Sequence, residues 1–271
     1  MSNTKRNIKA RRARNIMKVL SAALIASMSL LSTVAAAKCP APGTLGTSRV
    51  LHVDSTTAPR VGLKQFPKTL PLGDHEVVLT FDDGPLPATT PKVLAALAAE
   101  CVRATFFVIG KPASQYPDLV RRIAAEGHTI GHHSWSHRRM PRIPAGQTTQ
   151  EIDRGISAVE LALHGVGKAV PTTPFFRFPG FESTAATLDL LQSRGIVVFG
   201  ADLWASDWDP MTPTEELKLI TGRLRTLGKG IILFHDTKAR TAAMLPAFLR
   251  YLRDNQYRVV HVVPNETVVN P

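Results

Sequence analysis

The stretch "EVVLTFDDGP", residues 76–85, is the part of the chain from which the fold can be argued. Its apolar beginning is short and β-rich, which predicts a buried strand. The strand leads directly into two adjacent carboxylates, Asp82 and Asp83, and Gly84-Pro85 then ends it abruptly. Neighbouring carboxylates repel each other, so a pair at the end of a strand indicates a bound cation.

Further short β-rich runs follow, and helical stretches lie between most of them. The predicted strands cover residues 77–81, 104–109, 129–133, 175–178, 196–200, 231–234 and 258–262. Thr90-Pro91 and 212–215 are typical helix starts, and Thr148 with Glu151 predicts a capping box for another helix. Strands that alternate with helices imply a parallel sheet, and seven of them predict an α/β protein with a distorted (β/α) barrel. Catalytic groups in such barrels gather at the carboxyl ends of the strands.

The chain divides into segments of different composition. They are a leader (1–37), an irregular extension rich in Pro, Gly, Thr and Ser (38–75), the main domain (76–262) and a C-terminal tail (263–271). The leader has seven Lys or Arg, no acidic residue, an apolar stretch and small residues before Lys38. This pattern predicts a signal peptide and an exported protein, periplasmic or secreted, which touches a membrane only through the leader. An uncleaved leader would instead act as a membrane anchor.

The charge of the chain bears on whether its partner is a nucleic acid. The formal charge is +12, but outside the leader 26 basic residues face 21 acidic ones. No basic stripe remains, which argues against a nucleic-acid partner.

The two cysteines of the chain allow two interpretations. Cys39 and Cys101 could form one disulfide outside the cytoplasm. The apolar run that follows Cys101 favours the other interpretation, a small buried hydrophobic side chain.

A pair of histidines follows the third predicted strand in "GHHSWSH", residues 131–137. His133 and His137 are four residues apart, a spacing that brings two imidazoles to one side of a helical turn. Two histidines and one carboxylate form a three-ligand catalytic zinc site with an open position. Zinc is favoured by this ligand set, and cobalt or nickel would also be accepted.

Unusual polar residues follow three other predicted strands. They are Arg177 in "FFRFPG" (175–180), Asp207 and Trp208 in "WASDW" (204–208), and His235 in "IILFHD" (231–236). Together with the aspartates that follow the first strand, they give an acid, a cation, a second acid and a histidine at successive strand ends. Such a set is difficult to explain as stabilising devices, because this edge of a barrel carries its chemistry.

These motifs, in their order, resemble those of the polysaccharide deacetylases with a NodB-homology domain, the carbohydrate esterases of family 4. The resemblance covers about residues 76–262. The first motif, Thr-Phe-Asp-Asp-Gly, stands intact at 80–84, the second runs from His133 to His137, and the fifth is Leu233-Phe234-His235.

The third and fourth motifs are altered. In the third, the proline of 177–180 is one place closer to the arginine than in the family pattern. In the fourth, only Asp207-Trp208 remains, and Trp204-Ala205 occupies the opening positions. These departures concern the acyl pocket and the sugar preference rather than the metal ligands.

The resemblance implies a role for each residue of the first two motifs. Asp83 would bind a divalent metal together with His133 and His137. Asp82 would act as the general base that takes a proton from the attacking water, and Arg177 would keep it ionised.

The remaining motifs supply the other roles in amide hydrolysis. His235 would be the general acid for the leaving amine, oriented by Asp207. The loop at Gly180 would offer a backbone N–H to the oxyanion. Trp208 and Leu233 would form the walls of a pocket for the acetyl methyl group; packing in the core is the alternative for Trp208.

The sequence therefore predicts an exported, metal-dependent N-deacetylase whose partner is an N-acetylated polysaccharide or oligosaccharide. Chitooligosaccharide, peptidoglycan and other N-acetylhexosamine polymers remain open. The alternatives are an O-acetyl carbohydrate esterase, because the same machinery hydrolyses esters, and a non-catalytic carbohydrate-binding relic.

Overall fold

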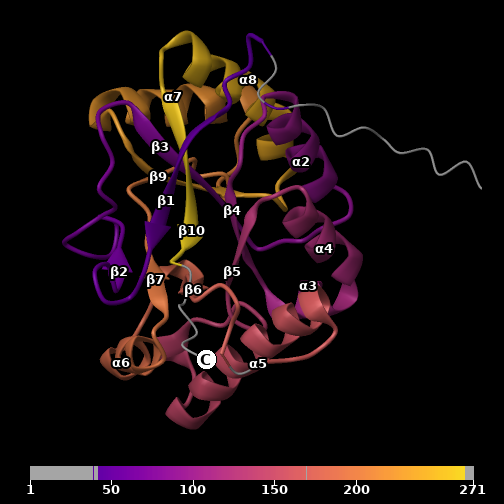
Figure 1. The fold of residues 1–271 in the computed structure, drawn as a ribbon, viewed down its shortest axis with the longest axis vertical. Helices are drawn as coiled ribbons and strands as arrows, with labels where there is room; N and C mark the ends of the chain where they lie inside the picture. The colour runs from indigo at the N-terminus through magenta and orange to yellow at the C-terminus, as the bar shows by residue number, and fades with distance from the viewer. Residues whose placement is uncertain (1–38, 40–41, 169, 266–271) are drawn as a thin grey trace, which may run out of the picture. The chain divides into compact units, whose positions relative to one another are not determined.

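The strand that ends in the two aspartates lies at the centre of the sheet (Figure 1). The computed structural model describes residues 39, 42–168 and 170–265, and in it β3 (Glu76–Asp82) is buried along its whole length. One edge pairs with β4 (Thr105–Val108) and the other with β9 (Gly230–His235), both in parallel, and β10 (Arg258–Pro264) pairs with its first residues. A strand covered on both faces requires apolar side chains on both, which explains the continuous hydrophobic run.

All seven predicted strands are present, and all their pairings are parallel. The paired order is β1-β10-β3-β4-β5-β6-β7-β2, and β9 and then β8 branch from β3. The strands not yet bounded are β1 (Thr47–Val53), β2 (Arg60–Val61), β5 (Thr129–His132), β6 (Phe175–Phe176), β7 (Val197–Phe199) and β8 (Leu203–Trp204). Within the described residues, hydrogen bonds between strands do not close the sheet into a ring.

Packing shows that the sheet nevertheless curls on itself. Alternate residues of the strands face inward, and Val78 of β3, Phe175 of β6 and Val262 of β10 belong to one buried cluster. The Phe199 ring of β7 lies 5.4 Å from the Phe107 ring of β4, although two strands separate them in the sheet. The predicted distorted barrel is confirmed, with side chains rather than hydrogen bonds filling its open seam.

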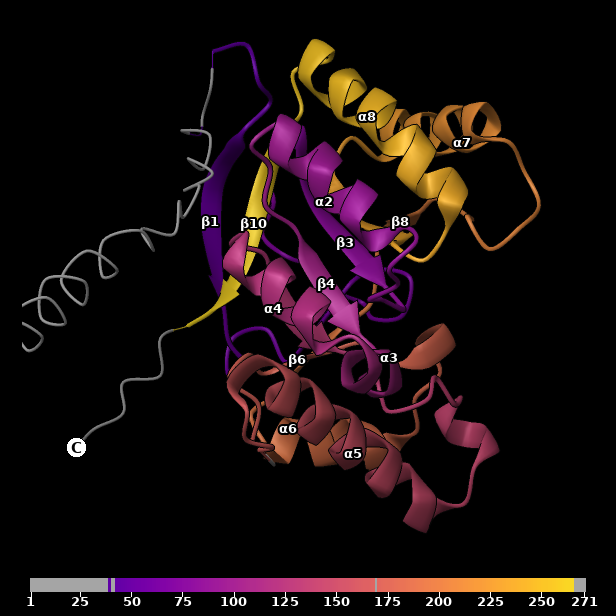
Figure 2. The ribbon, with the colours of Figure 1, turned by 90° about the vertical axis from the view of Figure 1, so that its right-hand side faces the viewer.

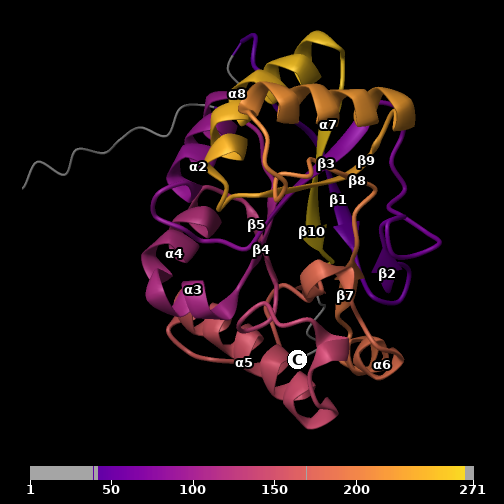
Figure 3. The same ribbon diagram turned by 180° about the vertical axis from the view of Figure 1, so that it is seen from behind.

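Helices cover the outer face of the sheet, as Figures 2 and 3 show from two sides. They are α2 (Thr90–Ala99), α3 (Gly110–Gln115), α4 (Pro117–Ala125), α5 (Ala145–His164), α6 (Ala185–Ser193), α7 (Pro213–Leu227) and α8 (Ala239–Asp254), with short 3-10 turns η1 (Met140–Arg142) and η2 (Pro179–Phe181). The predicted starts at Thr90 and Thr212 are confirmed, the latter with a capping box between Thr212 and Glu215. The start predicted from Thr148 is wrong, because α5 already begins at Ala145.

A stack of aromatic rings holds the end of β3 in place. The Phe81 ring lies 5.1 Å from that of Phe106 on β4 and 5.6 Å from that of Phe234 on β9. Full burial of one such side chain contributes about 1.5–3 kcal/mol. A slip of β3 by one residue would turn Phe81 inward and Asp82 outward, so this stack also fixes the direction of both aspartates.

The extension predicted to be irregular contains a strand of the sheet. β1 pairs with β10 over nearly its whole length, and Arg49 of β1 makes an ion pair of 2.7 Å with Glu76 of β3. The expectation for 38–75 is therefore wrong at β1 and β2. Prolines and threonines around these strands concealed them, since neither run shows a long apolar pattern.

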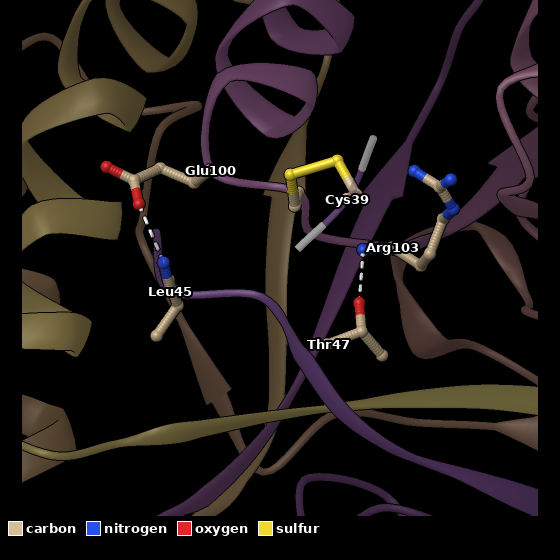
Figure 4. The surroundings of a disulfide bond; sticks show 6 residues. Cys39, Leu45, Thr47, Glu100 and Arg103 are labelled. Carbon is tan, nitrogen blue, oxygen red and sulfur yellow. Dashed lines mark hydrogen bonds between the residues drawn. A yellow bond between two sulfur atoms is a disulfide. The ribbon is translucent and has the colours of Figure 1, made fainter. Parts of the chain in front are cut away.

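The two cysteines form a disulfide, which corrects the preference for a free buried thiol at Cys101 (Figure 4). Their Cα atoms are 5.4 Å apart and 62 residues separate them in the sequence. Nearby, Leu45 N donates to Glu100 Oε2 (2.9 Å) and Arg103 N to Thr47 Oγ1 (2.8 Å). The extension is thus attached to the loop between α2 and β4 at several points.

The predicted leader and the last residues of the predicted tail lie outside the described residues. In the part that is described, no helix combines the length and the apolar character needed to cross a membrane.

Candidate active site

The carboxyl ends of the strands surround a cavity of about 490 Å³. Eight predicted site residues line it: Asp82, Asp83, His133, His137, Gly180, Trp208, Leu233 and His235. The other two, Arg177 and Asp207, are fully buried directly behind it and hydrogen bond to Asp82 and His235. The structure therefore brings all ten together. A larger hollow of about 650 Å³ along α7 carries no comparable group of side chains.

Asp83, His133 and His137 form a group with the geometry of a metal site. One potential ligand atom from each lies within 4.8 Å of the other two. Asp83 Oδ1 is 3.3 Å from His137 Nε2 and 3.6 Å from His133 Nε2, and this buried oxygen has no hydrogen-bond partner among the described residues. A buried carboxylate oxygen without a donor is costly, and a divalent cation between these atoms would remove that cost.

His133 is held in a tautomer that is able to bind a metal. Its Nδ1 lies 2.7 Å from the carbonyl oxygen of Arg177, which can only accept, so Nδ1 carries the proton and Nε2 presents its lone pair. Burial lowers the pKa of His133 to about 3, which keeps the imidazole neutral.

The two histidines come together through an irregular loop, not through the helical turn that their spacing predicted. Ser134 (φ 64°) and His137 (φ 61°) have left-handed backbone conformations, and Ser134 Oγ accepts from His137 N at 3.1 Å. The imidazole centroids lie 5.1 Å apart. The two imidazoles lie together as predicted, but the helical turn predicted between His133 and His137 is wrong.

Helix α5 holds this loop from behind. Glu151 Oε1 accepts from Ser136 N (2.5 Å) and Ser136 Oγ (2.7 Å), so the acid assigned to a capping box supports the metal group. A Cβ at Gly155 would lie 2.4 Å from the Ser134 carbonyl carbon, so only glycine permits this approach. The support by Glu151 and the close approach at Gly155 could not be predicted from the sequence, because both depend on a contact between distant segments.

Asp82 is held by a buried ion pair. Arg177 Nη1 donates to Asp82 Oδ1 at 2.7 Å, and the same guanidinium lies 4.2 Å from the Phe107 ring centroid. Arg177 also donates to Thr80 Oγ1 and to the carbonyl oxygen of Gly200. Burial raises the pKa of Asp82, and the charge of Arg177 opposes that shift. Thr80, the first residue of the intact motif, thus positions Arg177, a role that sequence reasoning missed.

His235 is bound to Asp207 on the opposite wall. Its Nδ1–H donates to Asp207 Oδ1 and its backbone N–H to Oδ2, both at 2.7 Å. Burial alone would lower the pKa of His235, but Asp207, helped by Asp83 and Asp82, raises it to about 9. The imidazolium is therefore the prevailing form at neutral pH, with Nε2 directed to the cavity and 3.8 Å from Asp83 Oδ2.

The remaining predicted residues line the cavity. Leu233 is buried, and Trp208 is 48% exposed, with its ring at a steep angle to that of His235 and 5.8 Å between the centroids. This exposure argues against the core alternative for Trp208. Gly180 adopts a left-handed conformation (φ 61°) in η2 at the rim.

Sequence reasoning missed several wall residues. They are Lys64, Arg139, Phe178, Phe181, Trp204 and Lys238. Lys64 belongs to the extension, and its Nζ lies 4.3 Å from the Trp204 ring centroid. The altered fourth motif could have pointed to Trp204, but Lys64 offered no signal within a segment interpreted as irregular.

The fold and the site define an α/β protein with a candidate metal centre flanked by two hydrogen-bonded acid–base groups. Comparison with known proteins indicates the family. Residues 70–199 match the family described as polysaccharide deacetylase. The chain is 32% identical over 189 residues to a peptidoglycan-N-acetylglucosamine deacetylase of Listeria monocytogenes, covering 70% of this chain and 38% of that protein.

Two solved structures are similar over most of the described domain. A Bdellovibrio bacteriovorus peptidoglycan deacetylase has a TM-score of 0.71 and 28% identity, covering 83% of this chain and 60% of that one. A family 4 carbohydrate esterase from Streptomyces lividans, in complex with acetate, has a TM-score of 0.58 and 31% identity, covering 70% and 91%. The chain belongs to the polysaccharide deacetylase family.

Proposed function

We propose that the protein is an exported, metal-dependent N-deacetylase that hydrolyses the acetamide of N-acetylhexosamine units in a glycan. The observation that carries this proposal is one cavity in which an Asp/His/His group lies between a buried Asp–Arg pair and a buried His–Asp pair. Hydrolysis of an amide needs a base for water, an acid for the amine and stabilisation of an oxyanion, and this cavity holds candidates for all three.

Asp83, His133 and His137 would hold the metal, and zinc suits two imidazoles and one carboxylate. When bound, a divalent cation supplies Lewis acidity and makes water easier to deprotonate. Cobalt and nickel fit the same ligands.

Asp82 is the proposed general base. Arg177 occupies Oδ1, which leaves Oδ2 directed to the metal group, 3.8 Å from His133 Nε2. Because Arg177 stabilises the carboxylate, Asp82 stays available to accept a proton from the attacking water despite its burial. Arg177 is then a positioning residue.

His235 is the proposed general acid. An amine leaves an acetamide only after protonation, and a protonated imidazole directed to the cavity can supply that proton. Asp207 positions the ring and favours its charged form. Leu233 and Trp208 would accommodate the acetyl methyl group, and the loop at Gly180 would direct an N–H to the oxyanion.

The substrate is proposed as a polysaccharide or oligosaccharide with N-acetylhexosamine units. Support comes from the relatives, although the chain spans only 38% of the Listeria deacetylase. The disulfide between Cys39 and Cys101 supports export, because such bonds persist in oxidising compartments.

A panel of acetylated glycans tests the proposal: peptidoglycan, chitooligosaccharides and O-acetylated xylan, each assayed for free amine and free acetate. Equal release of amine and acetate from the N-acetylated substrates is the expected outcome. Acetate without amine would identify an O-acetyl esterase, and binding without either product a carbohydrate-binding relic. Chelation should abolish the activity, and added zinc should restore it.

A further inference from the structure

A second carboxylate lies behind the His235–Asp207 pair. Glu216, in the first turn of α7, is fully buried, and its Oε1 is 2.9 Å from the hydroxyl oxygen of Thr241 on α8. The same hydroxyl is 2.8 Å from Asp207 Oδ2. Four side chains thus form a continuous buried chain: His235, Asp207, Thr241 and Glu216. The other oxygen of Glu216 has no hydrogen-bond partner within the described part of the protein.

Counting protons fixes the direction of these bonds. Asp207 accepts two N–H groups from His235 and is its charged partner, so it has no proton to give. The single hydroxyl proton of Thr241 is therefore best directed to Asp207. Thr241 then presents a lone pair to Glu216, and a bond of 2.9 Å between these groups requires a proton on Glu216.

The surroundings of Glu216 agree with a neutral side chain. Burial raises its pKa to about 7, and the nearby negative charge of Asp207 adds to this shift. The Thr241 hydrogen bond and the charges of Arg240 and His235 act in the opposite direction. An ionised Glu216 would compete with Asp207 for the one proton of Thr241 and leave one of the two carboxylates facing a lone pair.

We propose that Glu216, in its protonated form, is a positioning residue that acts through Thr241 to fix the Asp207 carboxylate and thereby the imidazole of His235. This inference rests on the proposed function, in which His235 protonates the leaving amine. Amide hydrolysis should depend strongly on the position of that acid. Hydrolysis of an activated aryl acetate should not, because a phenolate leaves without a proton.

The test compares kcat for an N-acetylglucosamine oligomer with kcat for 4-nitrophenyl acetate in the zinc-loaded protein. Thr241→Val and Glu216→Leu should lower amide hydrolysis roughly 10- to 100-fold, part of the 10²–10⁴-fold effect of a positioned acid, and lower ester hydrolysis by less than about threefold. Glu216→Gln, which can still donate to Thr241, should recover most of what Glu216→Leu loses.

Matched controls are Thr221→Val and Glu215→Gln. Thr221 is a buried threonine of α7 whose hydroxyl donates to the backbone carbonyls of Leu217 and Lys218, and Glu215 is the exposed neighbour of Glu216. Both should retain the wild-type ratio of amide to ester hydrolysis. Equal losses on the two substrates, or no loss, would overturn the positioning role, and so would a Gln variant as impaired as the Leu variant. If Glu216→Leu fails to fold, the ratio of amide to ester hydrolysis in Thr241→Val and Glu216→Gln still tests the positioning role. A wild-type protein that releases no amine would instead contradict the proposed function itself.

Discussion

The two sides of the cavity are built in different ways. On the acid–base side, Asp82, Arg177, His235 and Asp207 are at most 12% exposed, and each is hydrogen bonded to a partner in the protein. On the metal side, His133 is buried but His137 is 39% and Asp83 22% exposed, and no donor in the described part of the chain reaches the buried oxygen of Asp83. The protein therefore holds its proposed base and acid in place through its own hydrogen bonds, whereas the proposed metal ligand Asp83 would be satisfied by a cation.

Removal of a metal-side residue should have the largest effect. His133→Ala should reduce metal content and deacetylation together to background, because two remaining ligands bind a divalent cation poorly. Metal analysis and amine release on the same sample check this. His164→Ala, an exposed histidine far along α5, is the control and should keep full metal content. A His133→Ala protein with one equivalent of metal would show that the group has another purpose.

Substitution of the proposed base should have the next largest effect, and it should separate the two sides. Asp82→Asn keeps shape and all three ligands, so metal should remain bound while kcat falls about 10²–10⁴-fold. Asp83→Asn should lose metal first, and excess metal should partly restore its activity. If Asp82→Asn loses the metal and Asp83→Asn retains it, the assignment of the two aspartates is reversed.

The smallest effect should be a displacement of the pH profile. Asp207→Asn removes the charge that raises the pKa of His235 to about 9, so the pKa should fall toward the ordinary 6.5. Since the imidazolium is the form proposed to protonate the amine, the alkaline limb of kcat should move to lower pH, and the loss should grow as pH rises. Measurement of kcat from pH 6 to 10 tests this.

The same bond has a consequence for stability. Because the pKa of His235 is raised on folding, its protonated form stabilises the folded state. This stabilisation is fully present below pH 6.5 and is lost as the pH rises through about 9. Asp207→Asn should therefore reduce the drop in melting temperature across that window. If kcat of the wild type and of Asp207→Asn fell at the same alkaline pH, the proposed role of the His235–Asp207 ion pair would be contradicted.

The sequence predicted the acid–base side better than the metal side. Asp82 and His235 each follow an apolar run, which is enough to place them at the carboxyl ends of parallel strands, and in the structure these two strands are neighbours. The route from His133 to His137 could not be predicted, because its shape depends on Glu151 and Gly155 of a helix that follows in the chain.

Long-range pairings were missed for the same reason. β1 becomes a strand only where β10 supplies its edge, and Cys39 and Cys101 are 62 positions apart in the sequence although they are bonded in the fold. Thr148 and Glu151 fit the local pattern of a capping box, but the tertiary contact with Ser136 prevailed over it.

The left-handed conformation of Asp83 (φ 78°) limits which amino acids could replace it during evolution or in a mutant library. Asparagine, aspartate and glycine tolerate such a backbone, whereas a longer or branched side chain is strained there. Of those three, only aspartate carries an anionic ligand. Glutamate, an equally good metal ligand in principle, should therefore be depleted at position 83 in any selection for activity. If Asp83 binds the metal as proposed, the second aspartate of the "DDG" motif is required twice, once for its carboxylate and once for the turn that its backbone makes.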